Sequence, residues 1–208
     1  MVLRAFQFAV VLACCSLTAT SARADELPMT LEQFKLWRDY QDALQDERVQ
    51  KMPEGKRFGA IARNFKVSEK DLRVAVDKGD KHGESVGKLA EEAIRAALAD
   101  TELGPRLKTV RVDTSAAHVV TYLVWKAAKP DAFSIDKEVC TAAARARQAS
   151  PITSTFKFEV RDHISGSLKV FEGLISGSAA GRIRESSIVD FASTRYLKLF
   201  EKVSRMEL

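Results

Sequence analysis

Imidazole side chains are the groups in this chain best suited to acid–base catalysis, because they exchange protons near neutral pH. The sequence has three of them, His82, His118 and His163. Two fall on predicted strands, and an exported hydrolase that uses His118 or His163 is one hypothesis that the sequence leaves open. The motifs H-E-x-x-H and G-x-S-x-G, which would identify particular hydrolases, do not occur in the chain.

A glycine-rich loop at residues 177–184 is the second segment that could bind a ligand. It reads Gly-Ser-Ala-Ala-Gly-Arg-Ile-Arg. Backbone N–H groups of such loops can bind phosphate, and two arginines would add positive charge. The Walker pattern is absent, so we predict a flexible binding lip and no nucleotide site. The predicted binding residues are Ser178, Arg182, Arg184 and His163.

Oxygen and imidazole groups also gather in the segment DKGDKHGE, residues 77–84. Their spacing fits neither a calcium loop nor a zinc site, and lysines dilute the negative charge. We therefore predict a solvated turn between helices, with Gly79 as a helix C-cap. The sequence predicts no metal site and no cofactor.

Residues 61–76 resemble a bacterial helix-turn-helix segment. Ala62 falls at the small position of the first helix, and Leu72 falls where the second helix packs inward. Lys66 occupies the turn position that is often glycine. Residues 56–81 hold eight Lys/Arg and four Asp/Glu. The resemblance implies nucleic-acid binding as an alternative function, with these contact residues: Arg63, Ser68, Lys70 and Arg73.

The first 24 residues have the organisation of a secretory signal peptide. Arg4 precedes an apolar run, and Ala22-Arg23-Ala24 forms an A-x-A cleavage site. Export argues against nucleic acid as the partner. Cys14 follows Val-Leu-Ala, which resembles a bacterial lipobox, so lipidation at Cys14 and attachment to a membrane is the alternative to a cut after Ala24.

Removal of this leader changes the cysteine count and the charge. Cys140 is the only cysteine after residue 24, so no intramolecular disulfide can form there. We predict that it is a buried free thiol. The formal charge falls from +5 to +3, because two arginines leave with the leader. The basic excess lies in residues 106–208, which favours an acidic partner.

Hydrophobic periodicity divides the remaining chain near Gly104-Pro105. Apolar residues at steps of three and four predict a bundle of about four helices in residues 25–104, with capping boxes at Thr30 and Ser68. The helices are predicted at about residues 31–52, 58–65, 69–79 and 84–100.

Residues 105–208 predict a ββαββα domain with an antiparallel sheet. Strands are predicted at 107–114, 118–126, 156–164 and 168–177, a helix capped by Ser134 at 135–149, and a closing helix at 189–203. The strand at 118–126 is apolar on both faces, which predicts a central position. The fold class is therefore α+β, with the small residues Cys140, Ala142 and Ala143 packed against the sheet.

These observations predict an exported bacterial envelope protein, periplasmic or secreted, with a non-enzymatic binding or adaptor role. The predicted partner is an envelope protein or an anionic polymer, and a membrane is a partner only if Cys14 is lipidated. The sequence predicts no oligomeric state.

Overall fold

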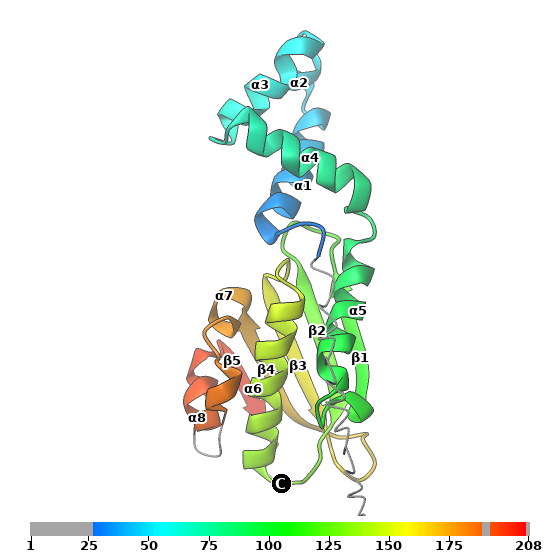
Figure 1. Ribbon diagram of the computed structural model, residues 1–208, viewed down its shortest axis with the longest axis vertical. Helices are drawn as coiled ribbons and strands as arrows, with labels where there is room; N and C mark the ends of the chain where they lie inside the picture. Colours follow the sequence, from blue (N-terminus) through cyan, green and yellow to red (C-terminus); the bar gives the residue numbers. More distant parts are fainter. Residues whose placement is uncertain (1–26, 189–191, 207–208) are drawn as a thin grey trace, which may run out of the picture.

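The chain forms an elongated molecule with a helical lobe at one end and a sheet lobe at the other (Figure 1). The computed structural model describes residues 27–188 and 192–206. The helical lobe contains α1 (Leu31–Gln45), α2 (Glu47–Gln50), α3 (Glu54–Asn64) and α4 (Glu69–His82). The helices of the sheet lobe are α5 (Val86–Ala99), α6 (Ala132–Ala149), α7 (Gly177–Ala180) and α8 (Ala192–Tyr196), with 3₁₀ turns η1 (Gly104–Arg106), η2 (Glu185–Ser187) and η3 (Leu197–Leu199). The strands are β1 (Leu107–Asp113), β2 (Val120–Lys126), β3 (Thr155–Arg161), β4 (Lys169–Ser176) and β5 (Lys202–Arg205).

The predicted α+β class, with helices preceding a sheet, is confirmed, but the predicted antiparallel sheet is wrong in one pairing. The five strands lie in the order β1-β2-β3-β4-β5. β2 and β3 are parallel, with Val120 opposite Thr155 and Lys126 opposite Arg161, and the other pairs are antiparallel. The helix α6 connects β2 to β3. A single helix returns the chain to the end at which β2 began, so the next strand must run parallel to β2.

The predicted closing helix at 189–203 is also wrong in its second half. Residues 189–191 lie outside the described residues, α8 spans only Ala192–Tyr196, and Lys202–Arg205 form β5. Pairing with β4 satisfies backbone groups that β4 would otherwise present at an open edge. Arg205 also forms an ion pair with Asp136, a buried residue of α6, which fixes β5 to the helical layer.

Local hydrogen bonds explain where the helices begin. Thr30 and Gln33 form the predicted capping box of α1, and Ser68 caps α4 by accepting from the Asp71 N–H at 3.0 Å. Asp46 separates α1 from α2 and caps the second of them. The cap of α6 is Asp131, which accepts from the Ser134 N–H at 2.7 Å, so Ser134 itself is not the cap.

The core of the sheet lobe lies between one face of the sheet and the helices. Aromatic rings of neighbouring strands pack there, with Trp125 edge-on to Phe158 and Phe156 stacked on Phe158. Small residues of α6, including Ala142 and Ala143, are fully buried, as predicted. Cys140, the third predicted core residue, is also buried. Burial raises the pKa of its thiol to about 12, so the thiol stays protonated.

Trp37 joins the helical lobe to the sheet lobe. Its indole lies against Gly79 and Gly83 of the α4–α5 segment, so closely that a Cβ at Gly79 would lie 2.0 Å from Trp37 Cγ. Gly79 is therefore a packing position inside α4, and the C-cap is Gly83. The buried face of α5, with Ala90 and Ile94, belongs to the same core as the sheet, although α5 precedes the boundary predicted near residue 104.

None of the helices in the part of the chain that the structure describes is long and apolar enough to span a bilayer. The predicted signal peptide, its cleavage site and the alternative lipidation site at Cys14 lie in residues 1–24, outside the described residues.

The contact between Trp37 and Gly79 leads to a stability prediction. We expect Gly79→Ala to lower the free energy of unfolding by about 1–3 kcal/mol, because the added methyl group overpacks the joint. Gly55→Ala is the matched control, since no atom lies within 4 Å of its Cβ position. Urea denaturation of both variants measures the difference, and equal stability would contradict the role of this contact.

Candidate binding surface

One face of the sheet carries no helix of the described chain. Helices α5, α6, α7 and α8 all lie on the opposite face (Figure 1). We call the uncovered side the open face. Every second residue of the strands points to it, because side chains alternate along a strand. Its central residues Tyr122, Val124 and Leu174 are only half-buried, whereas Leu123 and Trp125 on the other face are inaccessible.

A row of positive charge crosses the open face at right angles to the strands. Its five members occupy successive strands in register: Arg111, Tyr122, Lys157, Leu174 and Lys202. Neighbouring strands lie about 4.8 Å apart, so the three cations repeat at about 10 Å. The Arg111 guanidinium and the Lys157 ammonium lie 5.8 and 5.1 Å from the centre of the Tyr122 ring. The ring therefore stands between two cations, which its negative faces attract.

The acidic side chains of the open face already have basic partners. Glu159 forms an ion pair with Arg161, Lys169 Nζ lies 2.6 Å from Glu172 Oε2, and Asp113 Oδ2 lies 3.6 Å from the Arg111 guanidinium. The hydrogen bond from Lys169 lowers the pKa of the Glu172 carboxyl and keeps it ionised. Lys157 and Lys202 form no ion pair with any described residue. When the charged residues at its edges are included, the open face therefore has an excess of positive charge that can attract an anionic group.

The loop between β3 and β4, residues 162–168, forms a rim at one end of the open face. We call it the tip loop. The Asp162 carboxylate accepts from the N–H groups of Ser165, Ser167 and Leu168 at 2.7–2.8 Å. Partial desolvation acts to raise the pKa of this carboxyl, but the backbone donors outweigh it and hold the pKa well below its usual value. Asp162 is therefore ionised and organises the loop throughout the neutral range.

Three basic side chains from three different strands also donate to carbonyl groups of the tip loop. Lys108 donates to Gly166 at 2.9 Å, Lys126 to Ile164 at 2.8 Å, and Arg161 to Ser167 at 2.7 Å. Gly166 has φ +67°, a conformation that favours glycine. The loop is thus fixed from its inner side by a carboxylate and from the sheet by three cations.

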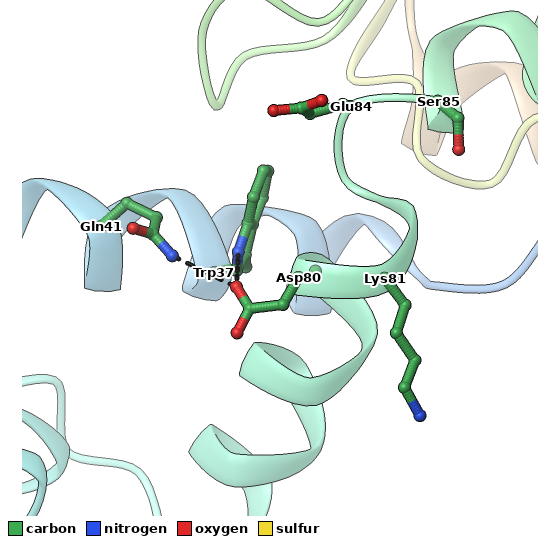
Figure 2. Close-up of a pocket in the computed structure, with 7 residues that line it drawn as sticks. Trp37, Gln41, Asp80, Lys81, Glu84 and Ser85 are labelled. Carbon is green, nitrogen blue, oxygen red and sulfur yellow. Dashed lines mark hydrogen bonds between the residues drawn. The ribbon is translucent and has the colours of Figure 1, made fainter.

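A polar pocket of about 480 Å³ lies where the two lobes meet (Figure 2). The indole N–H of Trp37 donates to Asp80 Oδ1 at 3.0 Å, and the Gln41 amide donates to the same oxygen at 3.3 Å. Lys81 and Glu84 on its rim are exposed and of opposite sign. Asp80 Oδ1 already accepts two hydrogen bonds from the protein, and the pocket lies between α1, the end of α4 and the segment that leads into α5.

The four predicted binding residues do not form one surface. Ser178, Arg182 and Arg184 follow β4 at the end of the sheet near Thr155, whereas His163 follows β3 at the opposite end. The amides of the glycine-rich loop are also engaged. The N–H groups of Gly177, Ala179, Gly181, Arg182 and Ile183 all donate to protein oxygens. These five amides are therefore not presented to a phosphate.

The predicted strand histidines are also separated. His118 precedes β2 and lies 3.0 Å from the Thr155 hydroxyl, while His163 lies beyond Arg161 at the other end of the same parallel pair. The length of β3 lies between them, so they cannot act as a pair on one substrate. Residues 77–82 belong to α4 and not to a turn. Among the described residues, no group of three or more His, Cys, Asp or Glu side chains is close enough together to bind a metal ion.

The segment that resembles a helix-turn-helix forms two helices, α3 and α4, joined by a short turn. Lys66 in the turn has φ +58°, the left-handed conformation for which the family often uses glycine. Ile61, Ala62 and Leu72 form a small buried cluster between the helices.

All four predicted contact residues are exposed, and three of them also make contacts within α3 and α4. Arg63 donates to the Gly59 carbonyl, Ser68 caps α4, and Arg73 lies 5.0 Å from the Phe58 ring. The fourth, Lys70, is exposed in the first turn of α4 beside the exposed Glu69 and Asp71.

Sequence reasoning missed the row on the open face. The alternation of Lys157 with buried phenylalanines indicates its outward direction, but the apolar side chains of residues 118–126 predicted only that this strand is central. The number of helices in the sheet lobe could have indicated this surface. These helices cover only one face of the sheet, so the other face and its cations remain exposed. Comparison with protein-family models, curated proteins and solved structures finds no match to this chain.

The tip loop generates a test of its rigidity. We expect Asp162→Asn to increase amide hydrogen exchange at Ser165, Ser167 and Leu168, because a neutral amide is a weaker acceptor than a carboxylate. In the folded wild type the pKa of the Asp162 carboxyl lies below the ordinary aspartate value of about 4. The contribution of the carboxylate to loop order is therefore complete above about pH 4 and is lost as the pH falls through the lower folded-state pKa. Hydrogen exchange of wild type and Asp162→Asn, measured by NMR at pH 6, tests the expected increase. Unchanged protection factors at the three amides would contradict it.

Proposed function

We propose that this protein is an exported bacterial cell-envelope protein that works by binding, and that the open face of its sheet is the binding surface. The observation that carries the proposal is the row of three cations beside half-buried Tyr122 and Leu174. An uncovered sheet face that combines apolar area with an excess of positive charge is typical of an interaction site. The partner is a protein with an acidic surface or an anionic polymer of the envelope.

Two features support binding over catalysis. The open face is broad and its rim carboxylates are paired, so it has positive charge without the acid–base pair that hydrolysis requires. The two histidines that a hydrolase would use lie at opposite ends of the sheet. Export rests on the leader at residues 1–24 and on the A-x-A site that ends at Ala24.

Charge reversal on the open face tests the binding surface. We expect Lys157→Glu with Lys202→Glu to reduce binding to a dextran sulfate resin about tenfold at 0.1 M salt, because two positive charges of the row become negative. Lys56→Glu with Lys70→Glu is the control, since both lysines are exposed on the helical lobe. Equal loss in the two double variants would mean that only net charge matters, and the proposed surface would be wrong.

The position of the mature N-terminus tests export. We expect mass spectrometry of the protein from the periplasmic fraction to give a chain that begins at Asp25, because the predicted cleavage follows Ala24. A chain that begins at a lipid-modified Cys14 would place the protein on a membrane. An uncleaved chain in the cytoplasm would contradict export.

A further inference from the structure

Two aliphatic side chains on the tip loop are more exposed than any other large hydrophobic side chain of the described residues. Ile164 is 77% exposed and Leu168 is 58% exposed. The other exposed members of this class, such as Val74 on α4, range from 36% to 51%. Burial of either side chain against an apolar medium would be favourable. Their joint exposure therefore points to a contact that the isolated chain does not make.

The loop that presents these side chains has little freedom to withdraw them. Asp162 holds three backbone N–H groups, and Lys108, Lys126 and Arg161 hold three carbonyl groups. A loop that is ordered before it binds loses less conformational entropy on binding. This arrangement holds Ile164 and Leu168 in their exposed positions.

The charges around the loop favour an anionic contact. Basic side chains on the loop's border and the open face outnumber acidic ones seven to four. The basic residues are Lys108, Arg111, Lys126, Lys157, Arg161, Lys169 and Lys202, and the acidic residues are Asp113, Glu159, Asp162 and Glu172. Hydrogen bonds to neutral carbonyls leave the charges of Lys108 and Lys126 in place. An apolar tip with cations behind it matches the layers of a bilayer that has anionic headgroups.

We infer that the tip loop docks the protein on an anionic lipid surface, with Ile164 and Leu168 inserted among the acyl chains and the neighbouring cations at the headgroups. A projecting tip fits a fluid surface that closes around it, whereas a protein partner would need a matching groove. The inference goes beyond the proposed binding role of the open face and does not depend on which ligand that face takes.

Vesicle sedimentation tests the inference with the full chain. We expect binding to vesicles of phosphatidylglycerol and phosphatidylethanolamine and much weaker binding to phosphatidylcholine. Ile164→Asn and Leu168→Asn should each lower the partition coefficient about tenfold, because each removes one inserted side chain. Met52→Asn with Val74→Asn is the matched control, since both residues are exposed on the helical lobe. The leader is common to all variants, so the differences between them report on the loop.

A fluorescent reporter separates insertion from attraction by charge. In Ile164→Trp the new indole should shift to shorter emission wavelengths on phosphatidylglycerol vesicles, while Trp125 is already fully buried and Trp37 nearly so. The absence of this shift, or equal partitioning of the wild type and the loop variants, would overturn the inference. Equal binding to neutral and anionic vesicles would overturn its electrostatic part. Unchanged circular dichroism shows that each variant is folded.

Discussion

A buried carboxylate, Glu138 of α6, fixes the arrangement on which the rest of the sheet lobe depends. It accepts from the Trp125 indole and the Arg106 guanidinium, both at 2.8 Å, and from the Ala128 N–H at 3.1 Å. A buried charge without such partners would be strongly unfavourable, so α6 has one acceptable position over β2. That position turns Trp125 toward the helices and, by alternation along the strand, turns Tyr122 and Val124 to the open face.

Elements that depend on neighbouring residues could be predicted from the sequence. The caps at Thr30 and Ser68 follow from local pattern and are confirmed. The strand predicted to be central, β2, is an interior strand paired on both sides, although the middle strand of the five is β3. The direction of β3 depends on where a whole helix crosses, and β5 depends on an ion pair between Asp136 and Arg205, which lie 69 positions apart. Such tertiary constraints overrode the helical period predicted for residues 189–203, since Lys202–Arg205 form a strand although all four residues are exposed and only Val203 is apolar.

The candidate binding surface was harder to predict, because residue types alone did not show which side chains are free to bind a ligand. The glycine-rich loop suggested a phosphate cradle, but its amides serve the protein's own turns. Lys66 stands at the turn position of the helix-turn-helix resemblance that is often glycine, and its backbone has a positive φ. Cations on the open face carry no motif, since strands 30 or more residues apart bring Arg111, Lys157 and Lys202 into one row. Only the pairing of strands places them together.

The order of the strands in the sheet has a consequence for how the molecule acquires its structure. Spatial order follows chain order throughout, from β1 to β5. Each strand therefore pairs with the one that immediately precedes it in the chain. The β1–β2 and β3–β4 pairs close over short loops and can form quickly, whereas the β2–β3 pair closes across α6 and the β4–β5 pair across residues 177–201, at a larger entropic cost. A chain of this kind can assemble from its amino end as successive segments become available, as a polypeptide does when it leaves a narrow pore.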